Sequence, residues 1–164
     1  MTGVPKNLTR HEGRISREDR ERLLGQRACA VWLTGLPSSG KSTIARALEE
    51  RLFAGGNLAY VLDGDNFRQG LNSDLGFSPA DRAENIRRLS EVAVLFLDAG
   101  VILIAAFISP FRAHREAARA RVGPSRFLEI FIDTAPEVCE SRDPKGLWAR
   151  ARRGEVPDFT GVSS

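Results

Sequence analysis

The sequence predicts an α/β fold in which a mostly parallel sheet is covered by helices on both faces. Short runs that are apolar throughout alternate with longer segments whose apolar residues recur every three or four positions. Continuously apolar strands are typical of a parallel sheet buried on both faces. Right-handed crossovers bring the carboxyl ends of such strands to one edge, where ligands bind. The polar segments 35–42 and 63–68 and Ser109 all fall at this edge.

The first half of the chain supplies two strands and their helices. After a loose arm over residues 1–15, Ser16 and Asp19 form a capping-box pattern that predicts a short helix ending near Gly25. The segments that follow have the apolar runs and periodicity expected of a buried sheet and an amphipathic helix. These elements are a strand over 28–34, a helix over 41–53 and a strand over 58–62.

The second half repeats the alternation. Ser78, with Asp81 three residues later, predicts the start of a helix that Gly100 ends. Thr134 and Glu137 form a similar pattern before the last expected helix. The remaining elements are strands over 101–107 and 127–132 and helices over 112–122 and near Val138.

Composition excludes several classes of protein. The 164 residues suit one domain, and the net charge of +3 is too small for a strongly basic nucleic-acid binder. The longest apolar run, 92–108, is interrupted by Asp98 and Gly100, so we expect no membrane partner. The N-terminal region has no apolar signal segment, and Cys29 and Cys139 have no metal-ligand spacing. We therefore expect a cytoplasmic protein with reduced thiols.

The segment GLPSSGKS, residues 35–42, fits the phosphate-binding pattern G-x-x-x-x-G-K-[ST] between an apolar strand and an amphipathic helix. Its glycines let backbone N–H groups point at phosphate oxygens, Lys41 reaches the β- and γ-phosphates, and Ser42 coordinates Mg²⁺. This context predicts a three-layer P-loop NTPase fold, against the alternative of a chance glycine-rich turn. The expected nucleotide contacts are Gly35, Leu36, Pro37, Ser38, Ser39, Gly40, Lys41, Ser42 and Thr43.

Two carboxylates follow the second strand. Asp63 and Asp65 are expected to face the phosphate loop across the sheet edge, where one could bind Mg²⁺ and one could accept a proton from an attacking hydroxyl. The alternative is an Asp-Gly turn in which Asp65 or Asn66 caps a helix. The third strand ends at Ser109 where a Walker-B strand ends in an acid, so Asp63 is the candidate for that function. Ser109 itself could bind a ligand or cap the next helix, and a cap is the commoner explanation.

The second half also carries candidate contacts for an acceptor. Arg82 and Asn85 are three residues apart on a predicted helix and share a face. With Arg68 and Phe77 they suit a ligand that has a phosphate or sulfate and a flat base. The alternatives are a core position for Phe77 and solvated arginines. The basic run over 145–153 could cover the triphosphate as a lid, or it could be a solvated helix face.

Six ordered segments together resemble the adenylyl-sulfate kinase family, with the match running from about Gly25 to Gly161. They are WLTGLPSSGKST, DGDNFRQGLNSDLGF, DRAENIRR, FISPFR, RDPKGLWARAR and DFTG. The resemblance implies transfer of the γ-phosphoryl group of ATP to the 3′-hydroxyl of adenylyl sulfate in sulfate assimilation. The products would be 3′-phosphoadenylyl sulfate and ADP.

The resemblance also implies roles for residues. Phe77 and Phe159 would sandwich the adenine of adenylyl sulfate. Lys41, Asp63 and Ser109 would be catalytic, Asp63 with Ser42 would hold Mg²⁺, and Arg150 would bind ATP. Ser109 matches a serine designated as a phosphoserine intermediate in the family, although direct in-line transfer needs only positioning and charge stabilisation. The remaining substrate contacts would be Asp65, Arg68, Arg82, Asn85, Ile108, Ser109 and Lys145.

The domain boundaries follow from the same comparison. We expect residues 1–24 to form an N-terminal arm with a short helix and residues 25–164 to form the P-loop kinase domain, without the final strand and helix that the resemblance implies for the family. Family loops usually have Ser and Gly where this chain has Pro37 and Ser38. Members often form dimers, so a homodimer is one expectation. The alternatives are a catalytically silent nucleotide-binding module and a P-loop kinase for another small-molecule acceptor.

Overall fold

Four parallel strands form the centre of the computed structural model, which describes residues 11 and 13–163. The strands are β1 (Ala30–Thr34), β2 (Ala59–Asp63), β3 (Ile102–Ala106) and β4 (Phe127–Phe131). Their order in the sheet is β2-β3-β1-β4, with Val31 paired to both Ile104 and Leu128. The parallel sheet confirms the predicted fold class. Most of the predicted arm lies outside the described residues.

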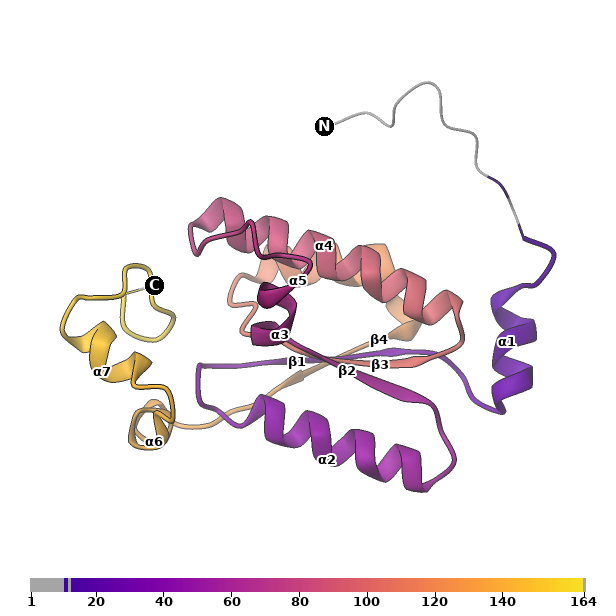
Figure 1. Cartoon of the computed structure of the whole chain (residues 1–164), viewed down its shortest axis with the longest axis horizontal. Coiled ribbons are helices and arrows are strands. Elements are labelled where there is room, and N and C mark those ends of the chain that lie inside the picture. Colours follow the sequence, from indigo (N-terminus) through magenta and orange to yellow (C-terminus); the bar gives the residue numbers. More distant parts are fainter. Residues whose placement is uncertain (1–10, 12, 164) are drawn as a thin grey trace.

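Helices cover both faces of this sheet (Figure 1). One face carries α2 (Lys41–Ala54), and the other carries α3 (Gly64–Gln69), α4 (Pro79–Asp98) and α5 (Arg112–Val122). A 3₁₀ turn, Pro124–Arg126, leads into β4. The core has one layer on each face, the first around Trp32, Leu89 and Leu103 and the second around Leu33 and Ile104. Burial of these side chains fixes the sheet between its helices.

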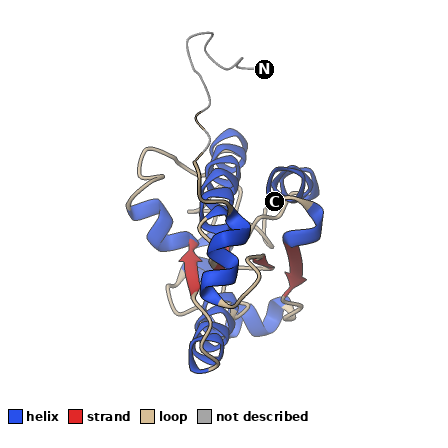
Figure 2. Cartoon of the chain, turned by 90° about the vertical axis from the view of Figure 1, so that its right-hand side faces the viewer, coloured by secondary structure: helices blue, strands red, loops and turns tan. Residues whose placement is uncertain are grey.

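The two ends of the sheet differ. Helices α6 (Pro136–Arg142) and α7 (Leu147–Arg152) lie beyond the carboxyl ends of the strands, beside the turn that joins β1 to α2. Helix α1 (Arg17–Leu24) lies at the opposite end, which faces the viewer in Figure 2. There Glu21 accepts a hydrogen bond from the Ala28 backbone and pairs with Arg126. These contacts join the described part of the predicted arm to the base of the sheet.

The two N-terminal capping predictions are confirmed. The Ser16 hydroxyl accepts a hydrogen bond from the Asp19 backbone before α1, and Gly25 ends that helix with a φ of 63°. Ser78 accepts from the Asp81 backbone in the same way before α4. No helix in the described ranges has the length and hydropathy needed to cross a bilayer. Cys29 is half-buried, Cys139 is buried, and both are free thiols.

Other local predictions were wrong. Helix α6 begins after Ala135 without a side-chain cap, because the Thr134 hydroxyl donates instead to the Ser39 carbonyl at 2.9 Å. Phe111, not Ser109, precedes α5. The alternative interpretation of residues 63–66 placed a helix after Asp65 or Asn66, and the short helix α3 is present but Asp63 caps it. Thr134 and Ser109 make tertiary hydrogen bonds instead of capping, and α5 and α6 begin without a side-chain cap.

Candidate active site

The loop between β1 and α2 has the backbone that a phosphate cradle requires. Gly35 has a φ of 148° and Gly40 a φ of 101°. A Cβ on Gly35 would lie 2.8 Å from the Ile132 carbonyl oxygen, so no larger residue fits there without a shift. Ser38 also has a positive φ, 63°, in the position after Pro37. The tight turn leaves the N-terminus of α2 facing the loop, an arrangement that favours an anion.

Three side chains from the later part of the chain hold this loop in place. Thr134 and Arg142 donate to the Ser39 carbonyl, at 2.9 and 3.5 Å. The indole of Trp148 donates to the Pro37 carbonyl at 3.2 Å. The sequence analysis assigned none of these residues to the site individually. Only the basic run over 145–153 indicated that the later part of the chain could lie near phosphates.

The Lys41 side chain folds back onto the phosphate loop, where it is expected to bind a triphosphate. Its Nζ donates to the Gly35 carbonyl at 3.0 Å and to the Leu36 carbonyl at 2.6 Å, and its exposed fraction is 8%. Burial lowers the pKa of Lys41 to about 8, against the opposing influence of Cys139, Asp63 and Asp65. An anionic ligand would offset this desolvation by offering the ammonium a charged partner.

Ser42 and Asp63 meet at the head of the loop. The Ser42 hydroxyl donates to Asp63 Oδ2 at 2.5 Å, and Asp63 Oδ1 accepts from the Asp65 backbone at 3.0 Å. Mg²⁺ prefers oxygen ligands and usually takes only one or two from the protein, with phosphates and water completing its shell. A hydroxyl and a carboxylate in direct contact beside a phosphate loop fit that ion.

Arg68 and Phe77 lie together on the acceptor side. The Arg68 guanidinium donates to the Gly76 carbonyl at 2.7 Å and lies 4.4 Å from the centre of the Phe77 ring. Phe77 is 64% exposed, which excludes the alternative that it belongs to the core. An exposed ring held by an arginine is a flat surface on which a base can stack.

Arg82 joins this surface to the end of the chain. Its Nε donates to the Phe77 carbonyl at 2.9 Å and its Nη1 to the Thr160 hydroxyl at 2.8 Å. Its Nη2 donates to the Asp158 carbonyl. Arg82 is therefore not a freely solvated arginine, because it fixes the Phe77 turn against the C-terminal segment.

Phe159 occupies a different environment from the one expected of a stacking residue. It is 7% exposed and packs edge to face on Trp148, with ring centroids 5.3 Å apart. Both rings belong to a small apolar cluster that Leu36 of the phosphate loop also contacts. The structure thus buries Phe159 while it exposes Phe77.

Asn85 is also buried, at 6% exposure, on the inner side of α4. Its Oδ1 accepts a hydrogen bond of 2.8 Å from Asn72 Nδ2, and Asn72 is fully buried. The sequence analysis did not assign Asn72, which lies inside a quoted motif but carries no pattern of its own. The two amides form a buried polar pair.

Ser109 is held in the interior. It has a φ of 34°, is 4% exposed, and its hydroxyl accepts from the Trp32 indole at 3.1 Å. The same hydroxyl donates to the Thr34 hydroxyl at 3.2 Å, and Thr34 donates to the Ile108 carbonyl at 2.7 Å. These contacts set the path of the chain beyond β3 and explain why the hydroxyl does not cap α5.

The basic segment near the C-terminus is largely paired. Lys145 forms an ion pair with Asp65 across the site. Arg150 pairs with Glu155 at 3.4 Å, with about half of its side chain exposed. Among the residues expected to contact ATP, Arg150 is thus engaged within its own segment, and Thr43 is exposed on α2.

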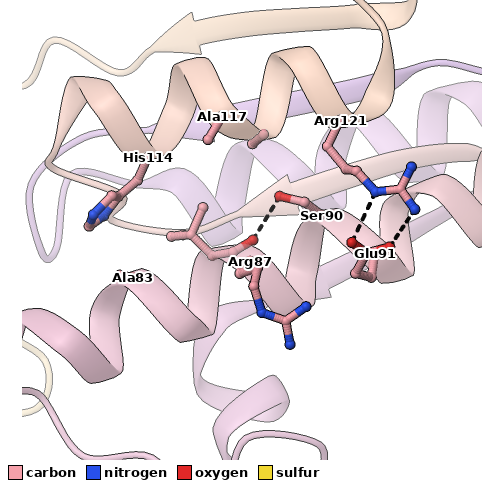
Figure 3. Close-up of a pocket in the computed structure, with 9 residues that line it drawn as sticks. Ala83, Arg87, Ser90, Glu91, His114, Ala117 and Arg121 are labelled. Atoms are coloured by element: carbon pink, nitrogen blue, oxygen red, sulfur yellow. Dashed lines mark hydrogen bonds and ion pairs between the residues drawn. The ribbon is translucent and has the colours of Figure 1, made fainter. Parts of the chain in front are cut away.

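A separate hollow of about 150 Å³ lies between α4 and α5 (Figure 3). Its lining includes Ala83, Ile86, Ser90 and His114. Ser90 donates to the carbonyl of Ile86 in its own helix, at 2.7 Å. None of the residues expected at the active site lines this hollow.

Comparisons with known proteins agree with this geometry. A family model described as adenylylsulphate kinase matches residues 27–164. An adenylyl-sulfate kinase of Citrobacter koseri is 56% identical, over 97% of this chain and 79% of that protein. A solved structure of the Mycobacterium tuberculosis APS kinase CysC in complex with AMPPNP and APS has a TM-score of 0.81 at 54% identity, over 84% of this chain and 81% of that chain. A hexameric APS kinase from Thiobacillus denitrificans has a TM-score of 0.56 at 39% identity, over 70% of this chain and 24% of that chain.

Proposed function

This chain belongs to the adenylyl-sulfate kinase family, and we propose how its residues bring about the reaction. The chain is an ATP-dependent kinase that acts on adenylyl sulfate. The observation that carries this conclusion is the likeness, at 54% identity, to an enzyme solved with AMPPNP and APS. The acceptor atom is the 3′-hydroxyl oxygen. It forms a bond to the γ-phosphorus while the bond to the β,γ-bridging oxygen breaks, ADP leaves, and the hydroxyl proton passes to water.

The nucleotide's phosphates lie in the loop over residues 35–42. Backbone N–H groups and the N-terminus of α2 bind their oxygens, and Gly35 gives the loop its close turn. Lys41 leaves the carbonyls of Gly35 and Leu36 and binds the β- and γ-phosphates. Thr134, Arg142 and Trp148 keep the loop shaped for that exchange, so the ligand need not order it.

Ser42 and Asp63 would hold Mg²⁺. Their contact supports the metal role for Asp63 over the role of proton acceptor, because both carboxylate oxygens already face donors at the head of the loop. When bound, the ion neutralises charge on the phosphate oxygens. Asp63 also caps α3, which fixes its carboxylate before any ligand arrives.

Adenylyl sulfate binds between the Phe77 turn and the C-terminal segment. Its adenine stacks on Phe77, and Arg68, Arg82 and Lys145 supply positive charge for its phosphosulfate. Phe159 completes the sandwich only after it leaves Trp148, so binding is expected to rearrange the apolar cluster around these rings. Lys145 likewise exchanges Asp65 for the substrate.

Ser109 positions the site and does not carry the phosphoryl group. Its hydroxyl is buried and bound by Trp32 and Thr34, so it is not presented to the nucleotide. Direct in-line transfer then needs only the alignment of donor and acceptor and the stabilisation of charge. Ser109 and Ile108 place their backbone next to the acceptor.

The test is ADP release from Mg·ATP with and without adenylyl sulfate, measured with a coupled assay. We expect release that depends on adenylyl sulfate. Turnover with a different acceptor alone would indicate another small-molecule kinase. Binding of ATP without turnover on adenylyl sulfate would indicate a silent nucleotide-binding module.

Oligomeric state and location extend this proposal. A homodimer is expected by family resemblance, while the T. denitrificans relative is hexameric. Sedimentation velocity at several protein concentrations distinguishes a dimer from a monomer or a hexamer. The free thiols of Cys29 and Cys139 support a reducing compartment such as the cytoplasm.

A further inference from the structure

Asn72 and Asn85 form a buried amide pair beside the acceptor site. Asn85 has a proposed role in substrate binding, whereas Asn72 has none so far. We propose that Asn72 is a positioning residue, which fixes the direction in which Asn85 presents its amide N–H groups to adenylyl sulfate. The inference rests on the proposed function, in which Asn85 contacts that substrate. It adds Asn72 and the groups that orient it.

The pair is close and enclosed. Asn72 Nδ2 donates to Asn85 Oδ1 at 2.8 Å, and Asn72 has no exposed surface. The backbone of Asn72 is also fixed, because its N–H donates to the Phe67 carbonyl and its carbonyl accepts from the Leu75 N–H, both at 3.1 Å. The backbone of Asn72 is therefore held in one place relative to Asn85.

The direction of this hydrogen bond is set by Arg88. An asparagine amide has an acceptor end and a donor end of nearly equal shape, so only its partners decide which way it lies. Arg88 Nη1 donates to Asp74 at 2.7 Å and to the Leu71 carbonyl at 3.1 Å. It lies 3.4 Å from Asn72 Oδ1. The positive guanidinium favours the amide oxygen on its side and disfavours the NH₂ group there. Asn72 then turns its NH₂ group to Asn85, which accepts with Oδ1. The Asn85 NH₂ group is the end that remains.

Arg88 is itself held firmly. Its two terminal nitrogens bind the Asp74 carboxylate at 2.7 and 2.8 Å, and its Nε binds Glu84 at 2.8 Å. A bidentate pair of this kind fixes the plane of the guanidinium as well as its position. Asp74 and Glu84 thus fix Arg88, Arg88 orients the Asn72 amide, and Asn72 orients the Asn85 amide.

The remaining amide end of Asn85 is available to a ligand. Within the described ranges, Asn85 Nδ2 has no protein acceptor, and the fully buried side-chain atoms that lack a partner are Arg17 Nε and Asp143 Oδ1. The Asn85 NH₂ group therefore keeps contact with solvent. Asn85 follows Arg82 by three residues on α4 and shares its helix face. Both would donate to oxygens of the same bound molecule.

The test compares Asn72→Ala with the isosteric Asn72→Asp by steady-state kinetics. Alanine leaves the Asn85 amide free to turn, and we expect the KM for adenylyl sulfate to rise about tenfold because orientation is lost. Aspartate can only accept, so it would hold Asn85 reversed, with its oxygen toward the substrate. We expect a larger rise for Asn72→Asp, while the KM for ATP and kcat stay within about twofold.

The same substitutions are then made in an Asn85→Ala background. If Asn72 acts through Asn85, Asn85→Ala raises the KM by itself and the Asn72 substitutions add less than about twofold to it. Ser90→Ala is the control for loss of a buried polar group from α4, since among the described residues the Ser90 hydroxyl bonds to the Ile86 carbonyl of its own helix (Figure 3). It should leave the KM for adenylyl sulfate unchanged.

The outcomes separate two kinds of failure. An unchanged KM in Asn85→Ala would show that the proposed substrate role of Asn85 is wrong, and the inference would fall with it. A raised KM in Asn85→Ala, with Asn72 substitutions that have no effect, would overturn the inference alone. So would a full Asn72→Asp effect that persists without Asn85, since it would then be an effect of charge. Thermal unfolding of each variant identifies any that fail to fold. If Asn72→Ala does not fold, the comparison of Asn72→Asp in the wild-type and Asn85→Ala backgrounds still tests the inference.

Discussion

The Ser42 hydroxyl donates to Asp63 Oδ2 at 2.5 Å, although the two residues are separated by a helix and a strand. The contact links the phosphate loop to the carboxyl end of the edge strand β2. It places a hydroxyl and a carboxylate oxygen, which suit Mg²⁺, side by side where β3 ends without an acidic residue.

Asp63→Asn should therefore change the response of the enzyme to Mg²⁺. The amide is a weaker ligand than the carboxylate, so we expect kcat/KM to fall by about two orders of magnitude or more, with partial recovery at high Mg²⁺. The measurement is initial rate against Mg²⁺ at fixed ATP. Asp98→Asn, which alters a surface pair with Arg20, is the control. An unchanged Mg²⁺ dependence would exclude Asp63 from the metal site.

Phe77→Ala tests the stacking surface. Because the ring is 64% exposed, its removal should barely alter thermal stability but should raise the KM for adenylyl sulfate about tenfold. Phe53→Ala, which removes a ring that is 77% exposed from α2, is the control. Equal effects of the two substitutions on KM would argue against stacking on Phe77.

Ser109→Ala separates a positioning role from a phosphorylated intermediate. The Trp32 indole N–H would lose its buried acceptor, which should cost about 1–3 kcal/mol in unfolding free energy. Turnover should persist at temperatures where the variant is folded. Wild-type enzyme incubated with γ-labelled ATP, without acceptor, should retain no covalent label. Loss of all turnover in a folded variant, together with label on Ser109, would reverse this assignment.

Gly161→Ala tests the packing of the C-terminal segment on the phosphate loop. Gly161 has a φ of 97°, and an added Cβ would lie 2.9 Å from the Trp148 ring and 3.1 Å from Leu36. We expect faster proteolysis of this segment and weaker binding of both substrates. Gly154→Ala introduces similar backbone strain, at a φ of 76°, but meets no atom within 4 Å. If both variants behave alike, strain and not packing is the cause.

Lys41 should leave a signature in the pH dependence of stability of the nucleotide-free protein. Its pKa is lowered by burial from 10.5 to about 8, so between these values the unfolded chain binds a proton that the folded chain does not. Stability from this group therefore rises as pH increases from about 8 toward 10.5. Lys41→Met should lack that rise relative to wild type in thermal unfolding at pH 7 to 10. Parallel curves for the two proteins would show that Lys41 is not desolvated.

The sequence by itself determined the strands, most helices and the phosphate loop. These depend on local rules: apolar runs such as 102–106, the capping residues Ser16 and Ser78, and glycines where a loop must turn. The ordered motifs added the family and hence the acceptor. The sequence was sufficient for these features because each depends on residues that are close together along the chain.

Only the tertiary structure decided which side chains meet. Thr134 resembles a helix cap in sequence, but it binds the phosphate loop because α6 packs there. Phe77 and Phe159 are alike in sequence, yet one is exposed and the other packs on Trp148. Asn72 has no motif signal, and only the structure brings its amide next to Asn85 and Arg88. A polar or aromatic side chain interacts with whichever group the fold brings within a few ångströms. The packing of the whole chain decides which group that is.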